Sequence, residues 1–228
     1  VGFQPDLVWI KSRSASYNNY LFDSNRGVTK ILSSDRTNAE STTAESLKAF
    51  ISTGFTYGDD ATGNENNASM VSWNWRANGG SLTTNNVGNQ TSYTQTDPSG
   101  GFSITKYAGT GSSMTVGHGL SVEPKLTIIK DLTATQDWVV YTKLIDGSMD
   151  YFVFNTDAAK GDSGLTGPNS SVWTWNSGSG FSNTASRDYI MYNFANIEGY
   201  CKVGTYVGNA NNNGTFVYTG FKPAWVMN

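Results

Sequence analysis

The chain has 228 residues, with 15 Lys and Arg against 18 Asp and Glu, and only 14% of its residues are charged, against about 25% in an ordinary globular domain. Its 7 Trp, 12 Tyr and 11 Phe exclude a disordered tail, and its slight negative charge argues against a nucleic-acid partner. One Cys and one His exclude a disulfide framework and the usual structural zinc sites. No apolar run approaches the ~18 residues of a membrane helix, so we expect no membrane insertion.

Short runs of β-forming residues, some alternating with period two, are separated by turns rich in Gly and Asn. In chain order, the clearest predicted strands lie at residues 7–11, 71–75, 126–130, 138–141 and 151–154. One stretch, residues 38–51, has the Ala and Leu spacing of a helix. Strands at this spacing predict an all-β fold of the sandwich or jelly-roll type.

Three landmarks occur twice, which indicates an internal repeat of about one hundred residues. The run that starts at Pro5 matches the run that starts at Pro124, including the apolar positions and the closing Lys. Aromatic residues flank Asn74 in the first copy and Asn193 in the second. A third landmark pairs residues 104–109 with residues 203–208. Each copy has the size of a small β-sandwich.

The repeat predicts a division of the chain into tandem β-sandwich units. Residues 1–80 would be a unit lacking its first strands, and residues 81–100 a polar linker with few apolar contacts. Residues 101–200 would be a complete unit, and residues 201–228 the opening strands of a further unit. The two partial units together would complete one sandwich, within one chain or between chains; a longer parent with further repeats is the alternative.

The sequence resembles tandem repeat domains in predicted tail or other virion proteins of marine bacteriophages and in related marine bacterial sequences. The residues that carry this resemblance are the run 2–11, the Asp23-Ser24-Asn25-Arg26-Gly27 turn, Trp73-Asn74-Trp75-Arg76, and Gly117-His118-Gly119-Leu120 ahead of Pro124. The resemblance covers nearly the whole chain except residues 81–100. It implies a concanavalin A-like sandwich, a fold shared with many lectins.

Two groups of residues are candidate binding sites. Trp173 and Trp175 fall on one face of a predicted strand, and with the adjacent Asn176 they could form a sugar-stacking platform; packing in the core is the competing interpretation. The densest acidic cluster is Asp59, Asp60 and Glu65, whose oxygen atoms could hold Ca²⁺. A solvated acidic turn is the alternative, because the spacing is not that of an EF-hand. No other cofactor is predicted.

Neither His118 nor Cys201 is expected to be catalytic. No nucleophile or orienting carboxylate lies near His118 in the sequence, so we expect a loop His that packs its ring or bonds to the backbone. Cys201 aligns with Phe102 in the other copy, which predicts a core position. The sequence therefore predicts no enzyme.

The leading functional hypothesis is a virion structural or appendage protein, located on the virion or outside the cell, whose repeated domains attach to a host-surface glycan. Its partners would be other virion proteins or copies of itself. A purely structural spacer, decoration or fibre-forming protein is the second hypothesis. A polysaccharide-degrading enzyme on a lectin-like fold is the third.

Overall fold

The computed structural model describes all residues, 1–228, and the chain folds almost entirely into antiparallel β-sheets. The all-β class predicted from the sequence is confirmed. The only helices are α1 (Ala61–Asn64) and a single 3₁₀ turn, η1 (Asn78–Gly80).

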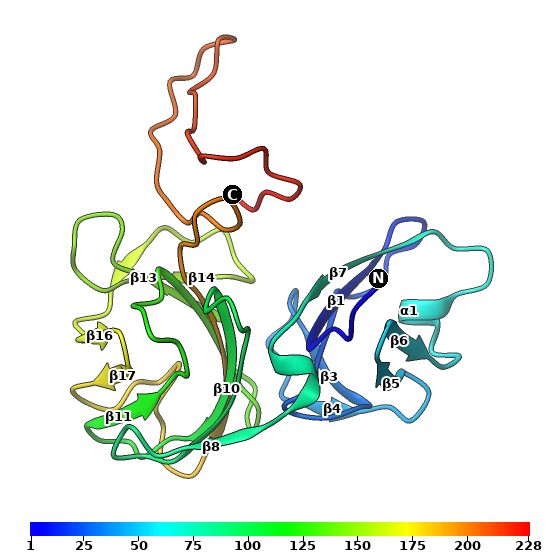
Figure 1. Cartoon of the computed structure of the whole chain (residues 1–228), viewed down its shortest axis with the longest axis horizontal. Coiled ribbons are helices and arrows are strands. Elements are labelled where there is room, and N and C mark those ends of the chain that lie inside the picture. The colour runs from blue at the N-terminus through cyan, green and yellow to red at the C-terminus, as the bar shows by residue number, and fades with distance from the viewer.

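Four sheets are stacked in layers (Figure 1). An outer three-stranded sheet has the order β11 (Met114–Gly117), β17 (Val172–Trp175), β16 (Gly167–Pro168). An eight-stranded sheet follows, with the order β15 (Gly161–Asp162), β14 (Asp150–Val153), β13 (Val139–Thr142), β12 (Leu126–Asp131), β18 (Asp188–Phe194), β10 (Phe102–Ala108), β9 (Ser92–Thr96), β8 (Thr83–Asn85). Next is a five-stranded sheet with the order β4 (Ser41–Thr42), β3 (Lys30–Ser33), β2 (Tyr20–Asp23), β1 (Leu7–Ser12), β7 (Met70–Trp75). The hairpin of β5 (Leu47–Ile51) and β6 (Gly54–Tyr57) is the last layer.

We call residues 1–80 the N-terminal unit, residues 81–200 the C-terminal unit and residues 201–228 the arm. The strand order β4-β3-β2-β1-β7 of the N-terminal unit is repeated as β15-β14-β13-β12-β18 in the C-terminal unit. The registers also agree: Val8 lies opposite Asn74, and Thr127 lies opposite Asn193. These are the positions that the sequence match aligns.

Equivalent lysines at the ends of the two central strands make equivalent bonds. Lys11 Nζ donates to the carbonyl of Tyr17 at 2.6 Å, and Lys130 Nζ donates to that of Gln136 at 2.7 Å. In each case the acceptor lies six residues after the lysine. The sequence match therefore extends to a side-chain bond that closes the loop after the strand.

Alternation along the strands sends side chains into three separate apolar layers. In β18, Met191 packs toward the three-stranded sheet, whereas Tyr192 packs toward the N-terminal unit. In β1, Leu7 joins this same central layer, whereas Val8 faces the β5–β6 hairpin. The two large sheets thus share one core, and the predicted picture of separate sandwiches joined by a linker is wrong.

The predicted linker, residues 81–100, instead contains β8 and β9. β9 pairs with β10 along five residues, and Ser92, Thr94 and Gln95 are buried in the sheet. A polar segment can form part of the sheet here because its buried polar groups are satisfied. Backbone pairing satisfies some of them, and Ser92 Oγ donates to the carbonyl of Gly117 at 2.7 Å.

The predicted helix at residues 38–51 is also wrong, because this segment forms β4 and β5. Its acidic residues serve tertiary contacts rather than a helix: Glu40 lies 3.3 Å from Arg26 and 3.5 Å from Lys30. The pairing of β5 with β6 overrides the local helical spacing.

A buried carboxylate fixes the point where the chain leaves the N-terminal unit. Asp6 accepts hydrogen bonds from the backbone N–H groups of Ala77 (2.5 Å), Gly79 (2.9 Å) and Gly80 (2.5 Å), and from Ser24 Oγ (2.7 Å). Gly79 and Gly80 have positive φ values, which let successive N–H groups converge on one carboxylate.

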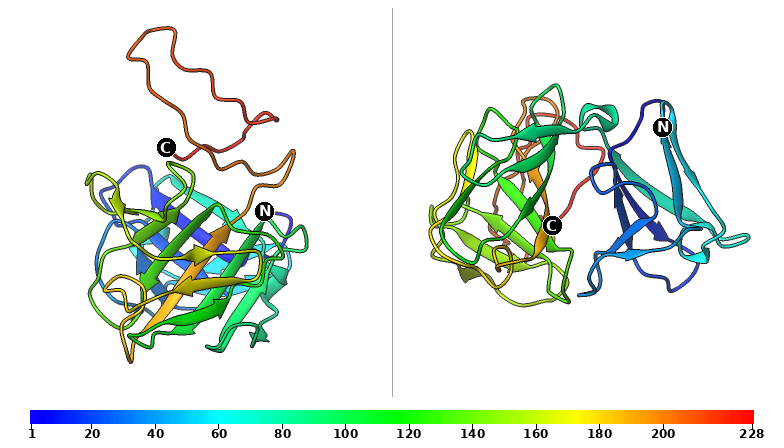
Figure 2. Two further views of the ribbon diagram at one scale, coloured as in Figure 1. Left: turned by 90° about the vertical axis from the view of Figure 1, so that its left-hand side faces the viewer. Right: turned by 90° about the horizontal axis from the view of Figure 1, so that it is seen from below.

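The arm contains no strand, although the sequence predicts opening strands there. It rises away from the stacked sheets as an extended loop (Figures 1 and 2). Its first residues are tied to the preceding turn: Ile197 and Cys201 exchange two backbone bonds, and Asn196 bonds to both the N–H and the carbonyl of Val203.

Candidate functional site

The predicted sugar platform does not form. Trp173 and Trp175 are 0% exposed and belong to the core between the eight- and three-stranded sheets. Their ring centroids are 4.3 Å apart, and their Nε1 atoms donate to Thr127 Oγ1 (3.3 Å) and Ser182 Oγ (2.9 Å). Asn176 is exposed, but its amide bonds to the carbonyl of Gly164. The competing interpretation, core packing, is correct.

The predicted calcium loop does not assemble as a ligand cluster. Asp60 caps α1 by accepting from the N–H of Thr62 at 3.0 Å, and Glu65 accepts from Tyr17 Oη at 3.2 Å. Asp59 is exposed. No group of three or more His, Cys, Asp or Glu side chains in the chain is placed to hold a metal ion. Asp60 and Glu65 therefore cap and tether the loop.

His118 is a structural residue, as predicted. Its ring is fully buried; Nδ1 accepts from the N–H of Leu120 at 3.2 Å, and Nε2 lies 3.1 Å from the carbonyl of Asn169. These partners suit a neutral ring that carries its proton on Nε2. Burial lowers the pKa of His118 to about 4.

Cys201 is only partly buried, so the predicted core position is not reached in this arrangement. It lies at the root of the arm, where its backbone bonds to Ile197. Burial raises the pKa of its thiol, which disfavours the thiolate that a nucleophile requires.

A buried ionic cluster joins the two units. Arg26 Nε donates to Asp23 Oδ2 at 2.5 Å, and Tyr192 Oη of the C-terminal unit donates to the same oxygen at 2.6 Å. The Arg26 side chain is 1% exposed and also donates to the carbonyls of Leu21 and Lys30 and to Glu40. The sequence shows the Asp-x-x-Arg-Gly turn as part of the resemblance, but no local pattern links it to Tyr192.

The electrostatics of this cluster keep its members in fixed protonation states. Burial, followed by the neighbouring Asp23 carboxylate, raises the pKa of Tyr192 well above its usual value. For Arg26, burial is the largest single effect and opposes ionisation, but the interactions with Asp23, Tyr192 and Glu40 together outweigh it and raise the pKa. Tyr192 thus remains a hydrogen-bond donor and Arg26 a cation, so the bonds between the two units persist near neutral pH.

Further direct bonds cross between the units. Trp138 Nε1 donates to the carbonyl of Ser33 at 2.8 Å, Lys130 Nζ donates to that of Thr37 at 3.0 Å, and Asn25 Nδ2 donates to that of Tyr93 at 2.8 Å. Trp138 is fully buried in the central apolar layer. The junction therefore combines apolar packing with satisfied polar groups, as in a domain interior.

Two strand edges of the N-terminal unit have no partner. β7 pairs with β1 on one side only, whereas its counterpart β18 is flanked by both β12 and β10. β6 pairs only with β5, whereas β17 lies between β16 and β11. Met70, Ser72 and Asn74 in β7 receive no backbone bond from any turn or loop. Unpaired edges of this kind are sites of strand addition.

The two equivalent asparagines differ at these edges. Asn193 is fully buried, accepts from Thr127 Oγ1 at 3.1 Å and donates to Ser103 Oγ of β10 at 3.2 Å. Asn74 donates within its own strand to Ser72, but its Oδ1 is buried without any partner. The donor to Asn193 Oδ1 is Thr127, and the residue of β1 that lies opposite Asn74 is Val8, which has no side-chain donor.

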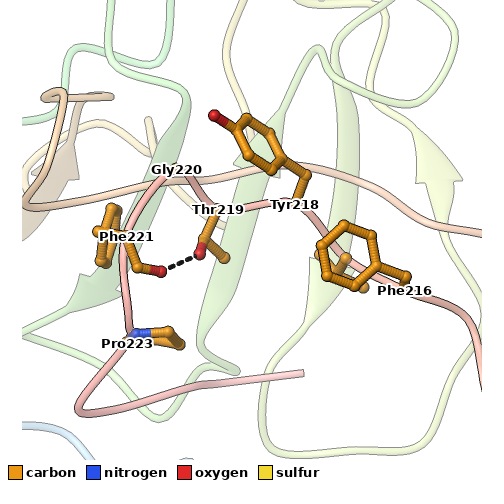
Figure 3. Close-up of a pocket in the computed structure, with 7 residues that line it drawn as sticks. Phe216, Tyr218, Thr219, Gly220, Phe221 and Pro223 are labelled. Atoms are coloured by element: carbon orange, nitrogen blue, oxygen red, sulfur yellow. Dashed lines mark hydrogen bonds between the residues drawn. The ribbon is translucent and has the colours of Figure 1, made fainter.

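The arm presents apolar side chains to solvent. Phe216 is 85% exposed and Val207 is 83% exposed. Phe216, Tyr218, Phe221 and Pro223 surround a shallow pocket formed by the arm alone (Figure 3). Further along, Trp225 contacts Trp75 at the end of β7, with ring centroids 5.6 Å apart. The arm thus carries large apolar residues that the sheets of this chain do not cover.

Together, these features define a layered all-β protein whose most distinctive surfaces are a pair of free strand edges and an uncovered apolar arm. The sequence matches, over residues 1–228, the family described as a domain of unknown function, DUF7483. The chain belongs to this family. Comparison with the curated proteins and with the solved structures finds no match. No helix of the chain has the length and hydrophobicity to cross a bilayer.

Proposed function

We propose that this protein is a structural module of a virion appendage, such as a tail or fibre, and that it acts outside the cell as a rigid spacer. Two features support the proposal: the sequence resemblance to virion repeat domains, and the way the two units are joined. The second carries the argument, because an appendage must fix the distance and direction between its ends.

The joint between the units is stiff for physical reasons. Leu7, Leu32, Ile104 and Tyr192 share one buried layer, so the units cannot rotate without exposing apolar surface. Each buried bond across the junction also requires its exact partner, and an unpaired buried group costs about 1–3 kcal/mol. A flexible tether would have neither property.

Attachment to a host-surface glycan is a further proposed role, but it would have to use side chains other than Trp173 and Trp175, because both indoles are buried. The observations therefore favour the spacer hypothesis over the lectin hypothesis. The proposed partners are other virion proteins and copies of this chain.

The location can be tested by electron microscopy with gold-labelled antibodies raised against the purified chain. Particles purified from the source that encodes the sequence should carry label on a tail or fibre. Antibody pre-absorbed with the chain is the control and should remove the label. Purified particles that lack the chain, while the host lysate contains it, would contradict the proposal.

A further inference from the structure

The C-terminal unit shows which strands are missing at the free edges of the N-terminal unit. Beside β18 lies β10, and beside β17 lies β11. The N-terminal unit has the counterparts of β18 and β17, namely β7 and β6, but no second strand pairs with either of them. Its own core is correspondingly small, with five buried apolar residues against twelve in the C-terminal unit.

The arm contains sequences that match the two missing strands. With an offset of 99 residues, Val203 aligns with Ile104, Tyr206 with Tyr107, and Gly208 with Gly109. When Gly220 is aligned with Gly119, Val217 falls on Val116 of β11. The apolar members of both matches therefore fall at core-facing positions of β10 and β11.

The strand beside β18 also provides a side-chain partner for Asn193, whose Nδ2 donates to Ser103 Oγ of β10. Asn74, which has no such strand beside it, donates its Nδ2 only within β7, to Ser72. The residue of the arm that aligns with Ser103 is Lys202. The unpaired Asn74 Oδ1 has a different origin, because Asn193 Oδ1 accepts from Thr127 and the aligned residue of β1 is the apolar Val8.

We propose that the arm of one molecule completes the N-terminal unit of a second copy of this chain by strand addition. Residues 201–208 would pair antiparallel with β7, and residues 215–218 would lie beside β6. The added strands would bring Tyr206 and Val217 into the small core and would cover apolar side chains that are now exposed. Main-chain bonds to an edge provide affinity in this recognition mode, and alternate side chains provide specificity.

A second copy is the occupant because of how the arm is held. Its root is fastened to its own turn through Ile197 and Asn196, and the segment that would supply the strands rises away from the sheets (Figures 1 and 2). Only the end of the arm returns, where Trp225 contacts Trp75. The donor and acceptor surfaces are different parts of the chain, so the contact is head-to-tail. Such contacts repeat into open filaments unless their rotation closes a ring. The proposal does not depend on the virion assignment.

The register can be tested with single-cysteine variants of the full chain in a Cys201→Ser background. In the C-terminal unit, Lys106 lies opposite Ile190, which places Thr205 opposite Val71. Directly opposed residues have the separation that a disulfide requires. We would mix the Thr205→Cys variant with the Val71→Cys variant under oxidising conditions. Cross-linked dimers should form several-fold faster than with the matched control, Gly204→Cys mixed with Val71→Cys, because residue 204 faces the opposite side of the sheet. Equal or absent cross-linking would overturn the proposal.

A second measurement distinguishes the source of the strand. The double variant Thr205→Cys, Val71→Cys should give mainly cross-linked dimers and longer species; a disulfide formed only within monomers would show closure by the same chain and would overturn the choice of a second copy. The unmodified chain should sediment as larger species as its concentration rises. A monomer at all concentrations would also count against the proposal.

Discussion

The N-terminal and C-terminal units have the same strand order and the same central register, but only the C-terminal unit has strands on both sides of its last long strand. Its large sheet is extended by β10, β9 and β8, and its small sheet includes β11. The same strand plan thus occurs once with edge strands of its own and once with an open edge. The unit without these edge strands, the N-terminal unit, has the smaller core.

Truncation of core side chains should show the largest difference in stability between the two units. Trp173→Ala removes a fully buried indole from the larger core, and we expect a loss of about 3–5 kcal/mol in the free energy of unfolding. Phe55→Ala, in the half-buried hairpin of the N-terminal unit, should cost about 1–2 kcal/mol. Urea unfolding of the two variants measures both values, and equal losses would mean that the two cores are equivalent.

Removing the cation of the ionic cluster should break the joint between the units. Arg26→Met leaves the buried Asp23 carboxylate without its counter-charge, so we expect a loss of about 3–5 kcal/mol. The exposed Arg36→Met is the matched control and should change stability by about 0.5 kcal/mol or less. An Arg26 variant as stable as the control would show that the ionic cluster does not stabilise the junction.

The buried His118 of the C-terminal unit should give the chain a pH-dependent stability that the N-terminal unit cannot supply. The folded pKa, about 4, lies below the usual value of 6.5, so the unfolded chain binds a proton first as the pH falls. Stability is fully present above pH 6.5 and is lost between pH 6.5 and 4, by about 3 kcal/mol. His118→Gln should flatten this part of the profile. An unchanged slope in urea melts of the variant would contradict the assignment.

The equivalent asparagines should differ in a smaller way. Asn193→Ala removes a group bonded to both Thr127 and Ser103 and should cost about 1–3 kcal/mol. Asn74→Ala should cost less in dilute solution, because its Oδ1 has no partner to lose. Under conditions of self-association, the cost of the Asn74 variant should rise. Thermal melts at two protein concentrations make this measurement.

Much of the fold could be predicted from the sequence, because strand patterns and repeated landmarks are local. The match of Trp73-Asn74-Trp75 with Tyr192-Asn193-Phe194 was enough to align β7 with β18, and the register agrees. The role of residues 81–100 could not be predicted, since their polar side chains are buried only through partners in β10 and β11. Polarity alone does not distinguish a linker from an edge strand.

The candidate site shows the same limit. Alternation places Trp173 and Trp175 on one face of their strand but cannot tell which face is covered, and here a second sheet covers it. Likewise, the density of carboxylates at Asp59, Asp60 and Glu65 gave no information on where their oxygens point. The open edges became visible only when the two sheets could be compared strand by strand.

Hydrogen exchange of the intact chain, followed by mass spectrometry at low and high protein concentration, tests the open edge most directly. At low concentration, peptides covering β7 should exchange faster than peptides covering β18, because only β18 has a neighbour on both sides. At high concentration, β7 and residues 201–208 should become protected together. Equal protection of β7 and β18 in dilute solution, with no change on concentration, would contradict the account.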